Sequence, residues 1–103
     1  MGDLENQWRT WESTAYPNAQ FPPGSEEGEV AGVDLALVVG DVAKILRDFF
    51  VDGRLDEVDR AMLPPVVDGL ERAVPLLAEP GRAYFDLALS LLRAIDGATR
   101  AGS

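Results

Sequence analysis

Three aspartates spaced by seven are the residues of this sequence best placed for chemistry: Asp34, Asp41 and Asp48. Seven residues make almost two helical turns, so all three would lie on one side of a helix. Asp41 stands in Leu-Val-Val-Gly-Asp-Val-Ala, where apolar neighbours would exclude water and suit its carboxyl to general acid or base catalysis. With Asp34 and the hydroxyl of Tyr84, it would serve a small apolar pocket.

A structural role is the more common use of a residue such as Asp41, because ion pairs between helices need the same partly buried carboxylates. A solvated position on the flank of the helix is a further alternative. Gly40 beside it would let another helix or a ligand come close, and close helix packing is the more frequent of the two. The arginines that would pair with Asp41 are Arg54, Arg60, Arg72, Arg82 and Arg93.

A second group of carboxylates lies in the segment 52–59, Asp-Gly-Arg-Leu-Asp-Glu-Val-Asp. An EF-hand calcium loop needs several acids before its glycine, whereas Gly53 directly follows the first acid. We therefore expect a helix end, a tight turn and the cap of the next helix here, and no metal site. Cysteine and histidine are both absent, which excludes disulfides, thiolate nucleophiles and the zinc, haem or iron–sulfur sites built on them. No cofactor is expected.

Aromatic residues are interleaved with prolines in the first 30 residues: Trp8, Trp11, Tyr16 and Phe21. Amphipathic aromatic side chains on an irregular arm are good anchors in protein interfaces. The equally weighted alternative is that the arm folds back and that its aromatic side chains complete the core of its own domain.

The composition limits the classes of partner. The chain has 103 residues, enough for one domain, with 18 Asp and Glu against 9 Lys and Arg and a net charge of -9. A field of this sign repels phosphate backbones and anionic membranes, so we expect no nucleic acid and no membrane partner. The first ten residues are too polar for a signal peptide, and the apolar run at 33–43 is too short to cross a bilayer. We therefore expect a cytoplasmic protein.

Apolar residues recur at helical spacing from residue 33 onward. The spacing predicts a helix over 33–51 that Gly53 ends, and a second helix that Asp56 and Asp59 begin with an approximate capping box. The pair Pro64 and Pro65 falls inside the second helix, so this helix must either kink or split.

Two more helices are indicated, one over 80–98 that opens at Pro80 and a short one over 3–13 that carries both tryptophans. No strand pattern competes. The fold class is therefore all-α, a three- to four-helix antiparallel bundle at 31–103 with an irregular, proline- and aromatic-rich N-terminal arm at 1–30. The arm carries more than half of the net charge.

The helix over 80–98 is apolar on most of its sides, with Asp86, Ser90, Arg93 and Asp96 as a narrow polar strip. Three helices alone cannot cover such a helix, so the arm, a second copy or another protein must cover it. We expect self-association, because two-fold homodimers are the most common small oligomers.

The segment 30–95 resembles a group of small helical actinomycete proteins to which no activity is attached. The likeness is carried by Gly32-Val33-Asp34-Leu35, Asp41, Gly53-Arg54-Leu55-Asp56, Asp68 and Tyr84-Phe85. The excess of arginine over lysine and the many Ala, Gly, Val and Asp residues fit a GC-rich coding genome. The resemblance implies a helical fold and carries over no catalytic residue.

Two functions remain in competition. The first is a small acidic binding protein that acts through protein–protein contacts, with a more basic protein or a second copy as partner. The alternative is a small biosynthetic enzyme or ligand-binding bundle, in which Asp41 or Asp34 acts as acid, base or cation stabiliser with help from Tyr84. The sequence leaves open whether the protein is an enzyme.

Overall fold

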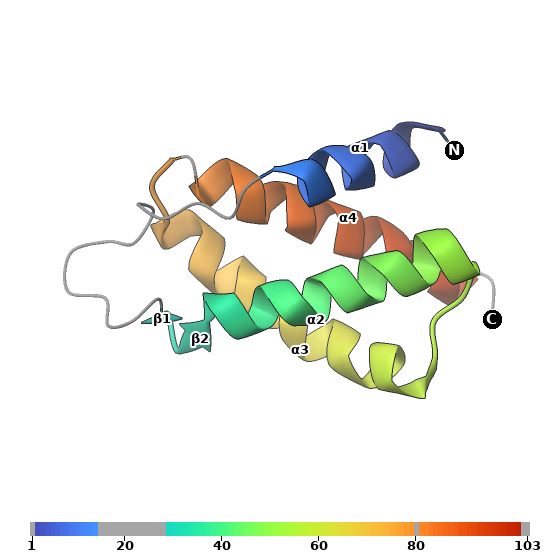
Figure 1. Ribbon diagram of the computed structural model, residues 1–103. Coiled ribbons are helices and arrows are strands. Elements are labelled where there is room, and N and C mark those ends of the chain that lie inside the picture. Colours follow the sequence, from blue (N-terminus) through green and yellow to red (C-terminus); the bar gives the residue numbers. More distant parts are fainter. Residues whose placement is uncertain (1, 15–28, 80, 102–103) are drawn as a thin grey trace.

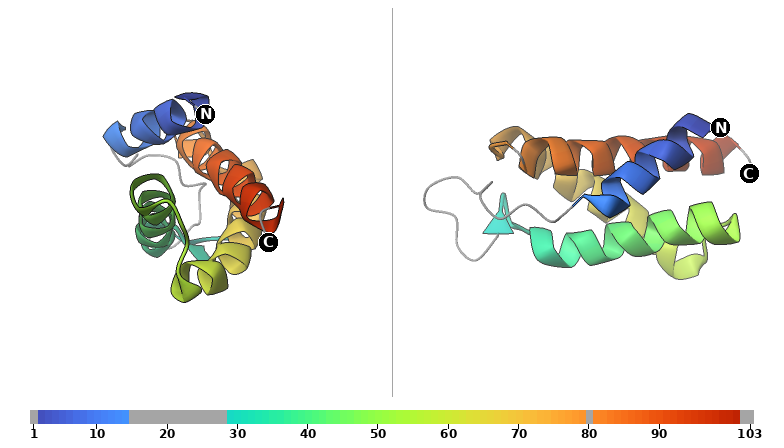
Figure 2. Two further views of the ribbon diagram at one scale, coloured as in Figure 1. Left: turned by 90° about the vertical axis from the view of Figure 1, so that its right-hand side faces the viewer. Right: turned by 45° about the horizontal axis from the view of Figure 1, so that its top comes forward.

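Four α-helices make up most of the residues that the computed structural model describes, which are 2–14, 29–79 and 81–101. Each helix runs opposite to the one before it, and the end-on view shows them grouped around a shared core (Figures 1 and 2). Their bounds are α1 Gly2–Ser13, α2 Leu35–Arg47, α3 Glu57–Ala73 and α4 Gly81–Ala101. The expected all-α bundle is confirmed; three of its helices lie within 31–103, and the fourth, α1, comes from the segment 1–30 that the sequence analysis describes as an arm.

The start and end of α2 follow from local chemistry. The Asp34 side chain accepts hydrogen bonds from the backbone N–H groups of Ala36 and Leu37, which caps the helix at its first turn. After Arg47 the chain makes one wider turn, the π-helix η1 (Asp48–Asp52), and Gly53 ends it with a left-handed φ of 80°. The helix predicted over 33–51 is thus an α-helix that begins two residues later and closes with a π turn.

A short antiparallel ribbon precedes α2, which the sequence pattern did not indicate. Strand β1 (Glu29–Val30) pairs with β2 (Val33–Asp34), and Val30 lies opposite Val33. The two residues between them, Ala31 and Gly32, have φ values of 54° and 78°. Positive φ at both positions is the geometry of a type I′ hairpin turn, which alanine adopts at a cost of about 1 kcal/mol. The first position of such a turn usually carries Asn or Gly, whereas alanine occupies it here, so the sequence pattern did not indicate the ribbon.

The helix α3 runs through both of its prolines without dividing. It begins with the expected capping box, in which the side chains of Asp56 and Asp59 each accept from the backbone N–H of the other. Pro64 and Pro65 remove two helical hydrogen bonds in mid-helix, yet the segment 57–73 stays one helix because its buried face is continuous on both sides of them. The short 3₁₀ helix η2 (Val74–Leu76), which contains Pro75, follows.

The helix α4 lies at the centre of the packing. Its residues Phe85, Ala88, Leu91 and Leu92 are fully buried, and it ends at Ala101, three residues later than predicted. Pro80, the predicted first residue of this helix, lies outside the described residues. No helix in the described part of the chain has the length and apolarity needed to cross a bilayer.

The helix α1 supplies the cover that α4 needs (Figure 1). Trp8 stacks on Phe50 of η1 with ring centroids 5.1 Å apart, and Trp11 packs on Tyr84 of α4 at 5.2 Å. Both tryptophans are buried, at 7% and 3% exposure. The sequence analysis considers two roles for these tryptophans, anchors in a protein interface or completion of the chain's own core. In this structure they complete the core. Tyr16 and Phe21 lie outside the described residues.

Candidate functional site

An open groove of about 340 Å³ runs between α2 and α3 and reaches the turn of the β-ribbon. Its wall is mostly apolar, and its charged residues are two aspartates and one arginine. It is lined by Gly32, Val33, Asp34, Leu37, Val38, Asp41, Met62, Pro65, Val66, Gly69 and Arg72.

The groove contains two of the three residues proposed for an acid–base pocket. Asp34 lies at the start of α2, where Oδ1 accepts from Ala36 N at 3.1 Å and from Leu37 N at 3.3 Å. These bonds fix the carboxylate in orientation, and both of them use Oδ1. Asp41 lies two turns along α2 and is half-buried. Asp34 and Asp41 therefore line the same groove.

One face of α3 builds the opposite wall. Met62, Pro65, Gly69 and Arg72 follow one another at steps of three and four residues, which places them on the same side of the helix. Gly69 allows β2 to approach, because a Cβ atom there would lie 3.2 Å from Cγ2 of Val33. The ribbon therefore packs close to α3 and closes one end of the groove.

Charge in the groove is not balanced. Arg72 is engaged by Asp68, one turn before it in α3. Asp41 forms no ion pair with an arginine or lysine of the described residues, so the proposed Asp41–arginine pair is absent from this part of the chain. Two carboxylates thus stand beside exposed apolar side chains without an ion pair among the described residues. The most exposed of these side chains is Leu37, at 70%.

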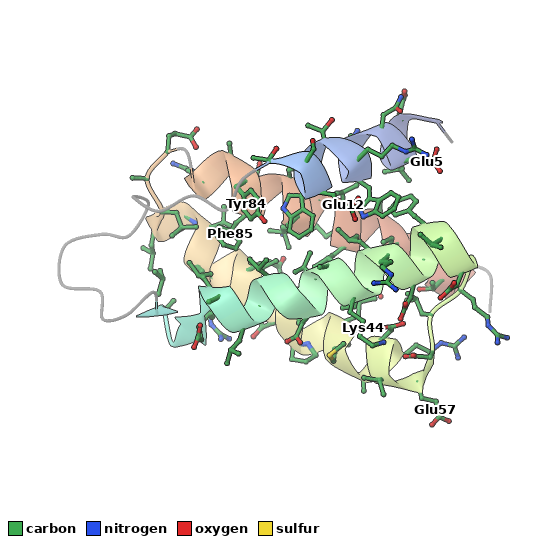
Figure 3. All side chains as sticks on the ribbon, viewed as in Figure 1. Glu5, Glu12, Lys44, Glu57, Tyr84 and Phe85 are labelled. Atoms are coloured by element: carbon green, nitrogen blue, oxygen red, sulfur yellow. The ribbon has the colours of Figure 1, made fainter. Side chains whose placement is uncertain are left out.

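The pairs between helices are made by other residues. Lys44 of α2 donates from Nζ to Asp48 Oδ2 at 2.8 Å, to Asp59 Oδ1 at 2.8 Å and to Asp56 Oδ2 at 3.2 Å. Figure 3 shows Lys44 between α2 and α3. Asp59 is completely buried, so this lysine compensates a charge within the core. A second pair joins Arg93 of α4 to Glu71 of α3 at 2.5 Å.

The Lys44 cluster shifts its carboxyl groups in opposite directions. The hydrogen bond from Lys44 lowers the pKa of Asp48, and the hydrogen bond from the Asp59 backbone lowers the pKa of Asp56. Burial raises the pKa of Asp59 above its ordinary value of 3.8, although the bond from Lys44 opposes this. The bonds to Asp48 and Asp59 raise the pKa of Lys44, which therefore stays charged.

These shifts link proton uptake to folding. Because folding raises the pKa of Asp59, its stabilising contribution is fully present below 3.8 and is lost as the pH rises through the raised pKa. Asp48 and Asp56 have lowered pKa values, so their contributions are present above 3.8 and are lost as the pH falls through those values.

The three carboxylates of this cluster have the composition of a cation site. One oxygen from each of Asp48, Asp56 and Asp59 lies within 4.8 Å of the others. The Lys44 ammonium, however, binds all three oxygen-bearing groups and already supplies the positive charge between them. Asp48, the third member of the predicted aspartate row, therefore belongs to a structural cluster and not to the groove.

Tyr84 does not join the two groove aspartates. It is buried against Trp11 and lies edge-on to Phe85 at 5.1 Å. Figure 3 places Tyr84 and Lys44 on opposite sides of α2. Tyr84 is not among the residues that line the groove. The three-residue constellation of Asp41, Asp34 and Tyr84 is thus reduced to its two aspartates.

A second hollow of about 520 Å³ lies between α1 and α2. Its lining mixes both charges: Glu12, Gly40, Ala43, Lys44, Arg47 and Asp48. Nothing lies within 4 Å of a Cβ atom added at Gly40, so the close helix contact expected there is not made. This hollow offers less apolar surface than the groove and no carboxylate outside the Lys44 cluster except Glu12.

Sequence reasoning missed the α3 wall of the groove and the role of Lys44. The α3 wall has a partial signal, since Met62 and Val66 belong to the apolar stripe that the helical spacing identifies. Lys44 stands four residues before Asp48, the spacing of a helical ion pair, but its contacts with Asp56 and Asp59 depend on how α2 and α3 pack.

Protein-family models, curated proteins and solved structures were compared with the chain, and none matches it. The resemblance to small actinomycete helical proteins therefore stays a prediction.

Proposed function

We propose that this chain is a small acidic binding protein of the cytoplasm that acts through protein–protein contacts, with the groove between α2 and α3 as its binding surface. The observation that carries the proposal is the pairing of exposed apolar side chains with unbalanced carboxylates in one hollow. Apolar surface of this kind favours burial by a partner, and the carboxylates select partners of opposite charge.

The charge of the whole chain supports the same function. A net charge of -9 attracts basic proteins over distances of roughly the Debye length, about 8–10 Å in physiological salt, and it speeds their encounter. It also opposes approach of a second acidic copy. A basic partner is therefore favoured over the homodimer that the sequence suggests, and self-association stays a prediction that the same experiment tests.

The alternative of a small enzyme or ligand-binding bundle keeps one supporting observation, namely that Asp34 and Asp41 line the same groove. Under this alternative the two carboxylates would bind a small cationic molecule or transfer its protons. The position of Tyr84, buried with Trp11, removes the hydroxyl donor that the alternative had assigned to the reaction.

Native mass spectrometry of the protein, purified gently at low salt from the cells that make it, tests the proposal. We expect a stoichiometric complex with a basic protein that dissociates as salt is raised. The variant L37S should lose the partner. The matched variant L76S should keep it, because Leu76 is 54% exposed but lies in η2 outside the groove.

Other outcomes would contradict the proposal. A retained small molecule without a protein partner would favour the ligand-binding alternative, and D41N should then abolish its binding while the protein stays folded. Binding that is insensitive to salt would contradict the attraction of a basic partner by charge. Binding that L37S and L76S weaken equally would exclude the groove as the binding surface.

A further inference from the structure

We infer that the groove between α2 and α3 binds an amphipathic helix whose basic residues are spaced by seven, with apolar residues between them. This inference rests on the proposed function and names the chemistry of the partner. The juxtaposition that supports it is an apolar strip between Asp34, which caps the start of α2, and Asp41 within α2.

The apolar strip has the form that a helix can cover. Leu37 is 70% exposed at the α2 side, and Met62 and Pro65 face it from α3. Val58, which is 56% exposed, lies one turn before Met62 on the same face of α3 and continues the strip. A helix that lies along a groove typically contributes apolar anchors at intervals of three and four residues.

The two aspartates set the spacing of the partner's charges. Asp34 and Asp41 are separated by seven residues, which is about 10 Å along a helix axis. A partner helix that lies along α2 presents residues at the same interval on one face, because seven residues are almost two turns. Basic residues seven apart would therefore meet both carboxylates, with the apolar residues over Leu37.

Both carboxylates are able to accept bonds from such a partner. Asp34 uses Oδ1 for both of its capping bonds, so its Oδ2 is available on a carboxylate that is already oriented. Asp41 has no ion pair among the described residues, and the nearby Arg72 is engaged by Asp68. The groove therefore presents two negative charges to its occupant.

A titration with synthetic peptides tests the inference on the full chain. The probe is a helical peptide of about 20 residues with lysines seven apart and leucines between them on one face. The control peptide has the same composition, with the lysines moved five apart so that they leave that face. Binding is followed by amide chemical shifts in NMR spectra and by calorimetry at low and at physiological salt.

We expect the first peptide to bind and to shift resonances of α2, α3 and the ribbon residues that line the groove, and no others. L37S should weaken its binding by about tenfold, the effect of losing one buried leucine side chain. D41N should weaken it by roughly two- to fivefold, the effect of one partly exposed ion pair. The matched variants L76S and D86N, altered at exposed positions outside the groove, should bind as the wild type does.

Equal binding of both peptides would overturn the inferred seven-residue spacing of basic residues. Equal losses of peptide affinity from D41N and D86N would show that binding depends on the overall charge of the chain and not on Asp41, which would also contradict the inference. If neither peptide binds while a protein partner in cells is still lost with L37S, the inference fails and the proposed function stands. Groove resonances that shift with protein concentration alone would instead assign the groove to a second copy.

Discussion

Removal of the Trp11 indole tests how much the packing of α1 on α4 contributes to the free energy of unfolding. Trp11 is 3% exposed and packs on Tyr84, so W11A removes one of the largest buried side chains of the described residues. Its Nε1 is also the buried side-chain polar atom of this part of the chain that has no hydrogen-bond partner. The two features act on stability in opposite directions.

The magnitudes predict different outcomes for two substitutions. Truncation of a buried tryptophan to alanine costs about 3–5 kcal/mol, while removal of an unpartnered buried N–H returns about 1–3 kcal/mol. We therefore expect W11A to lower the free energy of unfolding by about 2 kcal/mol, the difference between the centres of the two ranges. W11F keeps a ring against Tyr84 and removes the same N–H, so it should lie within about 1 kcal/mol of the wild type.

Urea denaturation followed by far-UV circular dichroism measures both values. W8F is the matched control, because Trp8 is similarly buried but its ring nitrogen is not among the buried atoms without a partner. W8F should therefore cost about 1–2 kcal/mol, more than W11F. A W11A protein as stable as the wild type would show that α1 does not pack on α4. If W11F were as unstable as W11A, the indole N–H would have a partner and the reasoning would be wrong.

Three further predictions concern other parts of the chain. In carboxyl NMR titrations, the pKa of Asp59 should lie above 3.8 and the pKa values of Asp48 and Asp56 below it. The free energy of unfolding of the wild type, relative to that of D59N, should increase as the pH falls from 7 toward 4. A pKa of Asp59 below those of Asp48 and Asp56 would contradict the assigned role of burial. G40A should stabilise the protein against urea by about 0.5–1 kcal/mol, since nothing lies within 4 Å of the added methyl group, and a loss would reveal a close contact at Gly40. A31N should raise the free energy of unfolding by about 0.5–1 kcal/mol, because Asn tolerates the positive φ of a type I′ turn better than Ala does, and no gain in thermal or urea stability would refute that turn.

Much of the helical architecture was predictable because its signals are local. Gly53 ends the η1 turn and the Asp56–Asp59 box begins α3 where the sequence predicts, since a left-handed glycine and reciprocal side-chain caps act within four residues. The short ribbon before α2 was not predicted, because its local signal is missing: Ala31 occupies a turn position that usually carries Asn or Gly.

The spacing of seven predicts Asp34, Asp41 and Asp48 on one side of a helix; Asp34 and Asp41 line the same groove, whereas Asp48 pairs with Lys44 outside it. The opposite wall was not predictable from that spacing. It depends on the angle at which α3 packs, on the approach that Gly69 allows to Val33, and on a helix that continues through its prolines.

The sequence by itself determined that this is an acidic all-helical chain without histidine or cysteine chemistry, because composition and short-range periodicity suffice for that. Only the tertiary structure decided which side chains meet. Lys44 binds carboxylates 12 and 15 residues away, and Trp11 of α1 packs on Tyr84 of α4, because burial of apolar area favours whichever faces fit together. That choice depends on the whole surface of each helix, and no local pattern of residues contains it.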